Sequence, residues 1–140
     1  MPRDGAVTHL LDTNSCVDHL RGGHASNVTA RLVAATPGSV VLCSVVVAEL
    51  LYGAYRSAHQ HQTLSQVQVF CRPFQSLPFD DRAADEYGRI RAHLAGLGTL
   101  IGPNDLLIAS IALANGLILV THNTSEFRRV PGLMMEDWLL

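Results

Sequence analysis

The amino-acid sequence contains no lysine, and all ten of its basic residues are arginine. Its formal net charge is −2 at pH 7. A chain with this balance does not hold nucleic acid through bulk positive charge. Arginine does suit bidentate contacts with phosphate and carboxylate groups, although the codon bias of a GC-rich genome would produce the same composition without any functional cause.

Cysteine pairs and long apolar runs are also lacking. The three cysteines are scattered, with no CxxC or Cys/His finger spacing, at Cys16, Cys43 and Cys71. They are therefore expected to be buried free thiols in a reducing compartment. The apolar runs are too short to span a bilayer, and the start of the chain lacks the layout of a signal peptide. We therefore expect a cytoplasmic protein with no membrane segment.

What the sequence does contain is an alternation of short apolar strands and helices within one domain, residues 1–140. Strands are expected at 7–11, 39–43, 75–78 and 117–121. Helices are expected from Thr13 to a break at 21–24, and at 26–35, 45–58, 60–72, 80–98 and 103–115, with Ser44 as a cap. The tail is expected to be a loop with a short edge strand. Strands that are continuously apolar indicate a parallel sheet covered on both faces, hence the α/β class.

Acidic residues lie where such a sheet would bring them together. Asp12 follows the first strand, Glu49 lies in the helix after the second, and Asp105 opens the helix that leads into the last. Singly, each has a structural explanation: a helix cap for Asp12, a solvated position for Glu49 and the helix dipole for Asp105. Together they would repel one another and lose hydration, so we expect a compensating cation. Oxygen ligands favour Mg²⁺ or Mn²⁺, which suits metal-assisted phosphodiester hydrolysis.

Four segments carry a resemblance to a known family: "LLDTNSCVDHL", "SVVVAELLYGA", "GPNDLLIASIALANG" and "LVTHNTSEFRRVPGLMMEDW". In order and spacing they resemble the motifs of PIN-domain ribonucleases, and most closely those of the VapC toxins of bacterial toxin–antitoxin pairs. The resemblance covers nearly the whole chain. It implies a PIN-like α/β/α sandwich with a central parallel sheet. It also implies an RNA-cleaving, Mg²⁺- or Mn²⁺-dependent homodimer that is inhibited by a cognate VapB-like antitoxin.

The resemblance also implies roles for individual residues. Asp12, Glu49 and Asp105 correspond to the family's metal ligands. Thr13 and Ser44 fit supporting hydroxyl positions, and Asn14 fits the polar position that orients the first aspartate.

One position departs from the family pattern. Many members have a fourth acid after the last strand, where this chain has Asn123. We expect Asn123 to take that catalytic position, with Glu126 as the alternative. The departure puts a second metal site in doubt but leaves the first unaffected.

Some residues outside the acidic set are candidates for contacts with RNA or antitoxin. Arg128 and Arg129 follow the proposed site closely and are the better candidates, whereas Arg89 and Arg91 lie in an amphipathic helix where a solvated face is the preferred explanation. Tyr52, Phe127, Trp138, Met134 and Met135 are expected to pack in the interior. The apolar segment "VVVAELLYGAY" is a candidate dimer or antitoxin surface.

Two other functions remain open at this point. A phosphatase with an aspartyl nucleophile would usually need a second acid two residues after Asp12, where the chain has Asn14. A catalytically weak or inactive PIN domain could serve only as an RNA- or protein-binding module. This alternative stays open because the chain has Asn123 where many family members have a fourth acid. RNA cleavage that EDTA abolishes would separate a nuclease from such a module.

Overall fold

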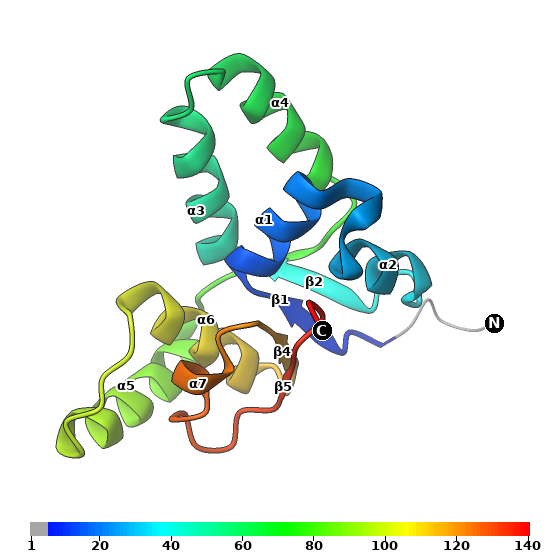
Figure 1. Cartoon of the computed structure of the whole chain (residues 1–140). Helices are drawn as coiled ribbons and strands as arrows, with labels where there is room; N and C mark the ends of the chain where they lie inside the picture. Colours follow the sequence, from blue (N-terminus) through cyan, green and yellow to red (C-terminus); the bar gives the residue numbers. More distant parts are fainter. Residues whose placement is uncertain (1–5) are drawn as a thin grey trace.

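A computed structural model describes residues 6–140 (Figure 1). Its centre is a five-stranded sheet in the order β3-β2-β1-β4-β5, and each pair of neighbours is parallel. The strands are β1 (His9–Leu11), β2 (Val40–Cys43), β3 (Ser76–Leu77), β4 (Ile118–Val120) and β5 (Met135–Glu136). The parallel sheet and the short edge strand in the tail are confirmed.

Helices cover both faces of this sheet, as the continuous apolar strands predicted. One group is α1 (Thr13–Gly22), α2 (Asn27–Ala34), α3 (Ser44–Tyr55) and α4 (Gln60–Cys71), with a 3₁₀ turn at Gly23–Ala25. The other group is α5 (Asp81–Gly96), α6 (Pro103–Ala114) and the short α7 (Thr124–Phe127). Figure 1 shows the first group on one side of the sheet and the second on the other, with α3 and α4 forming a hairpin that projects away from it. The α/β/α sandwich is confirmed.

Two details of the helices differ from the sequence prediction. Ser44 begins α3 but does not cap it, because the N-cap position belongs to Cys43 and carries no side-chain hydrogen bond. Helix α7 was not predicted, since four residues are too few to give a periodic signal.

The core forms between the sheet and the helices. Phe127 is fully buried and Trp138 is 3 % exposed, as expected. Met135 is partly buried against the core. The expectation was wrong for Met134 and for Tyr52, which is 65 % exposed. Helix α3 buries the face that carries Val46, Leu50 and Ala54, and a residue two positions after Leu50 points away from that face.

The cysteines are free, as predicted, with Cys16 and Cys43 buried and Cys71 half-buried. Burial raises the pKa of Cys43 to about 11, so its thiol stays protonated and unreactive. Within residues 6–140, no helix is both long and apolar enough to cross a membrane. The chain start, for which we expected no signal peptide, includes residues 1–5 and so lies partly outside the described residues.

Candidate active site

The candidate site lies where the strand order reverses. The chain goes outward from β1 through β2 to β3, and then crosses to the other side of β1 to form β4. In parallel α/β sheets, ligands bind beyond the carboxyl ends of the strands at such a switch point. Asp12 follows β1 directly, and Thr121 to Asn123 follow β4. The backbone N–H of Asp12 donates to the carbonyl of Val120 at 3.0 Å, which joins the two strand ends.

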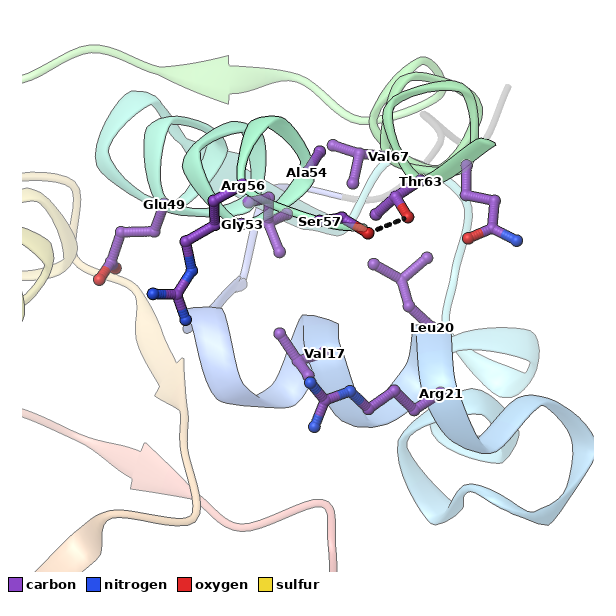
Figure 2. Close-up of a pocket in the computed structure, with 12 residues that line it drawn as sticks. Val17, Leu20, Arg21, Glu49, Gly53, Ala54, Arg56, Ser57, Thr63 and Val67 are labelled. Carbon is purple, nitrogen blue, oxygen red and sulfur yellow. Dashed lines mark hydrogen bonds between the residues drawn. The ribbon is translucent and has the colours of Figure 1, made fainter. Parts of the chain in front are cut away.

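Glu49 projects from α3 toward this edge (Figure 2) and ties three helices together. One of its carboxylate oxygens, Oε1, accepts a hydrogen bond from the Thr13 hydroxyl on α1. The other, Oε2, accepts from Nδ2 of Asn104 on α6 at 3.2 Å. Thr13, which we expected to be a supporting hydroxyl, is thus in contact with Glu49. Asn104 was missed, although a polar residue beside Asp105 at the start of an apolar helix was a usable signal.

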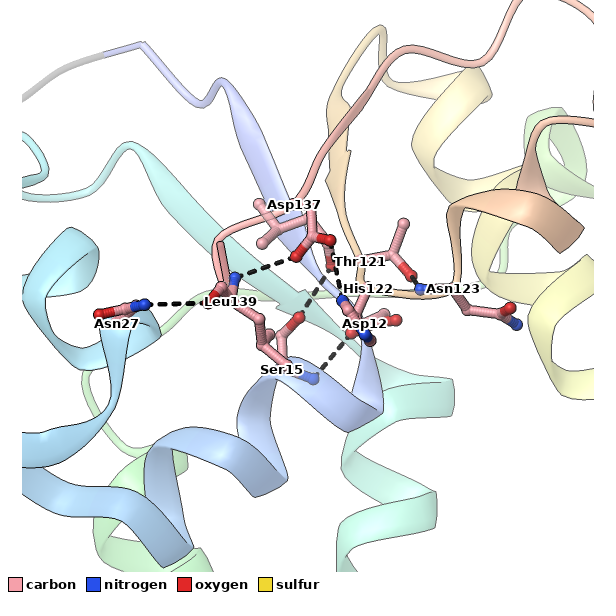
Figure 3. Close-up of polar contacts among 9 residues, drawn as sticks. Asp12, Ser15, Asn27, Thr121, His122, Asn123, Asp137 and Leu139 are labelled. Atoms are coloured by element: carbon pink, nitrogen blue, oxygen red, sulfur yellow. Dashed lines mark hydrogen bonds and ion pairs between the residues drawn. The ribbon is translucent and has the colours of Figure 1, made fainter.

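Asp12 is buried at the start of α1, with 3 % exposure (Figure 3). Its Oδ1 accepts from the backbone N–H of Ser15 at 2.8 Å, so the side chain caps the helix. Burial raises its pKa, although hydrogen bonds from Thr121 and Ser15 partly oppose the shift. The same carboxylate thus caps α1 and belongs to the candidate site. Its hydrogen bonds to Ser15 and Thr121 leave it little freedom to move.

Asp105 is the most perturbed acid of the group. It lies in the first turn of α6, and its pKa is raised to about 7, first by burial and then by the charge of Glu126. Asp12 and Glu49 raise it further. The acids therefore crowd one another, as the sequence predicted. Such crowding is relieved by a proton or by a cation.

Glu126 lies beside Asp105, and Asn123 donates a hydrogen bond to Glu126. The Glu126 carboxylate accepts from the backbone N–H of Gly102 at 2.8 Å and from Nδ2 of Asn123 at 3.2 Å. These bonds help lower its pKa, with the Gly102 bond acting most strongly. The sequence prediction preferred Asn123 for the fourth position. The geometry instead favours Glu126 there, with Asn123 orienting it.

Two of the predicted supporting residues make no such contact. The Asn14 and Ser44 side chains are exposed and form no hydrogen bond within residues 6–140. The role proposed for Asn14, orienting Asp12, is filled by the Ser15 backbone and Thr121. Ser44 does lie near Thr13 and Glu49, since all three line one surface pocket.

The candidate arginines divide into two groups. Arg89 forms ion pairs at 2.9 Å with Asp85 and at 2.7 Å with Glu86, both on its own helix. Arg91 donates to the hydroxyl of Tyr87 at 2.8 Å. These contacts agree with a solvated helix face.

Arg128 and Arg129 differ from that pair because they follow α7, near the acids. The charge of Arg129 contributes to lowering the pKa of Glu126, and Arg128 is exposed. They remain candidates for phosphate contacts.

Within the described part of the chain, no three His, Cys, Asp or Glu side chains are positioned as a ready-made metal-binding group. The chemistry of the site nevertheless suits a hard cation. Its donors are carboxylate oxygens, which Mg²⁺ and Mn²⁺ prefer. The mutual repulsion that raises the pKa of Asp105 is what a bound cation would offset.

Comparison with known proteins agrees with this fold. The PIN domain family model matches residues 9–133. Ribonuclease VapC2 of Rickettsia felis is 36% identical over 132 residues, which cover 94% of this chain and 98% of that protein. The tRNA(fMet)-specific endonuclease VapC of Shigella flexneri is 41% identical over 129 residues, covering 92% and 96%.

Solved structures give the same result. The DNA-bound VapBC of Salmonella typhimurium superposes with a TM-score of 0.89 at 35% identity, covering 95% of this chain and 99% of that one. VapBC2 of Rickettsia felis, bound to a DNA fragment from its promoter, gives a TM-score of 0.86 at 34% identity, covering 94% and 99%. The chain therefore belongs to the PIN-domain family. Its relatives there are VapC proteins, at 36% and 41% identity.

Proposed function

We propose that this protein is an endoribonuclease that hydrolyses RNA phosphodiester bonds as the toxin of a toxin–antitoxin pair. The observation that carries the proposal is the gathering of Asp12, Glu49 and Asp105 at the switch point of a PIN fold, with Glu126 beside them. Relatives of similar length are named as VapC ribonucleases and endonucleases. The position of Glu126 weakens the alternative of an inactive binding module, because it supplies the acid that Asn123 lacks.

We further propose that the activity depends on Mg²⁺ or Mn²⁺. Asp12, Asp105 and Glu49 would hold the ion, with Glu126 at the fourth position. A bound ion of this kind lowers the pKa of a water ligand and polarises a phosphoryl oxygen. Thr13 and Asn104 fix both oxygens of Glu49. Glu49 is therefore the group we propose to orient the attacking water and accept its proton.

The proposed partners follow from the relatives. The solved neighbours are VapBC complexes, and we propose that a VapB-like antitoxin binds and neutralises this chain. We propose a homodimer in the cytoplasm, where RNA is the substrate. Helix α3, with Tyr52 and Tyr55 exposed, remains the candidate surface for the dimer or the antitoxin.

The function is tested by incubating total RNA with the purified protein in Mg²⁺, in Mn²⁺ and in EDTA. The proposal expects discrete fragments with either metal and none in EDTA. Asp105→Asn should abolish them, whereas Asp85→Asn, the same change on the exposed face of α5, should not. Fragments that persist in EDTA would contradict the metal proposal. Intact RNA with folded, metal-loaded, antitoxin-free protein would contradict the nuclease proposal.

A further inference from the structure

A pocket of about 740 Å³ lies between α1, α3 and α4, with Glu49 at one end (Figure 2). A second hollow, of about 620 Å³, is lined by Thr13 and Asn104. Glu49, Gly53 and Arg56 line both hollows. Arg56 therefore belongs, with Glu49 of the acidic site, to the part of the lining that the two hollows share.

Arg21 and Arg56 are two cations of this region that have no acidic or hydrogen-bonding partner among the described residues. Within residues 6–140, neither guanidinium forms an ion pair or a hydrogen bond. Arg89, by contrast, is paired with acids of its own helix. Figure 2 shows the Arg56 side chain extending from α3 toward α1, the helix that carries Arg21. A guanidinium whose N–H donors are unused is suited to binding phosphate oxygens.

Tyr52 adds an aromatic surface to these charges. Tyr52 is 65 % exposed and lines the second hollow. The Arg56 guanidinium lies over its ring, 5.3 Å from the ring centroid. Exposed aromatic rings beside arginine provide stacking surfaces for unpaired bases. The ring and the cation together thus suit a nucleotide, with its flat base and charged phosphate.

We propose that Arg21, Tyr52 and Arg56 bind an unpaired RNA strand where it leaves the acidic site. This rests on the proposed function and adds residues that position the substrate. The acids repel phosphate, so an RNA strand needs compensating positive charge close by. A chain without lysine has only arginines to supply it. Arg128 and Arg129 follow α7 beside Glu126, on the other side of the sheet from α1 and α3, so arginines lie on both sides of the acids.

The test measures binding apart from cleavage. All variants are made in an Asp105→Asn background, and the anisotropy of a fluorescein-labelled single-stranded oligoribonucleotide is followed over a range of salt concentrations. The tested changes are Arg21→Gln, Arg56→Gln and Tyr52→Leu. Arg72→Gln is the charge-matched control, because Arg72 is exposed at the end of α4 and lines neither hollow.

Arg21→Gln and Arg56→Gln should each weaken binding by about tenfold and reduce the slope of log Kd against log salt by about 0.7. Tyr52→Leu should weaken binding by about tenfold without changing the slope. Arg72→Gln should leave both the affinity and the salt slope close to those of the Asp105→Asn parent protein. Equal affinities for all the variants would overturn the proposal.

Two other measurements complete the test. Inhibition by the antitoxin and the oligomeric state are followed for the same variants. Lost inhibition or lost dimers with unchanged RNA affinity would assign this surface to a protein and overturn the RNA proposal. If the wild-type protein cleaves no RNA but the variants show the predicted changes in affinity, the binding surface is upheld and the proposed nuclease activity fails. The failure of one proposal can therefore be distinguished from the failure of the other.

Discussion

Asp105 gives the sharpest prediction, because its carboxyl binds a proton much more tightly in the folded protein than in the unfolded chain. Its pKa is 3.8 in the reference state and about 7 in the fold. The folded state therefore loses stability as pH rises from near 4 through 7. Three pKa units correspond to roughly 4 kcal/mol. Since Asp105 is only partly buried, solvent screening reduces the expected loss to about 1–2 kcal/mol.

The assay is thermal unfolding in EDTA, with wild-type protein compared with Asp105→Asn. Asparagine cannot titrate, so the variant should be the more stable protein at about pH 8, by roughly 3–8 °C in Tm. The gap should narrow as pH falls through 7 and close only near pH 4 and below, where Asp105 is protonated in both the folded and the unfolded chain. Asp85→Asn is the matched control, because Asp85 is exposed and paired with Arg89. The difference in Tm between Asp85→Asn and the wild-type protein should not grow in favour of the variant as pH rises.

A divalent cation should reverse this order. With Mg²⁺ or Mn²⁺ at about a hundred times its Kd, the wild-type protein gains about 2.7 kcal/mol, whereas Asp105→Asn lacks a ligand and gains less. Parallel stability curves for the two proteins in EDTA would refute the argument about burial and repulsion. Equal stabilisation of both by the metal would refute the assignment of Asp105 as a ligand.

Three further predictions concern neighbouring residues. Asn104→Ala should lower kcat about fivefold and leave KM unchanged, because one hydrogen bond that orients Glu49 is lost; an unchanged kcat would remove Asn104 from the site. Glu126→Gln should weaken Mg²⁺ affinity at least about tenfold by thermal titration, and unchanged affinity would return the fourth position to Asn123. Phe127→Ala should lower the free energy of unfolding by about 3–5 kcal/mol in denaturant titration, whereas Met134→Ala at an exposed position should change it by less than about 0.5 kcal/mol. Similar losses for both would contradict the described core.

Much of the fold was predictable from local patterns. Strands β2 and β4 are continuous apolar runs, and the helices between strands carry clear start and stop signals, such as Pro103 at the start of α6 and Gly116 after it. These features depend on residues close in the sequence. The positions of Asp12, Glu49 and Asp105 could then be inferred from the rule that ligands bind beyond the ends of parallel strands.

What escaped prediction depends on contacts between distant segments. Glu126 reaches the backbone of Gly102, across 24 positions of sequence, and Asn104 reaches Glu49 across 55. A local pattern can mark Asn104 and Glu126 as candidates, but it does not identify their distant partners. Tyr52 was misplaced for a related reason. An apolar helix shows no polar face from which its exposed side can be identified, and only the packing of α3 decides it.

The central claim is that the clustered acids cleave RNA, and Asp12→Asn tests it most directly. Asparagine keeps the oxygen that caps α1, so the helix and the fold should survive, as circular dichroism can verify. The account predicts that the folded variant no longer cuts total RNA in Mg²⁺ or Mn²⁺, while wild-type protein yields discrete fragments. Undiminished metal-dependent cleavage by folded Asp12→Asn would contradict it.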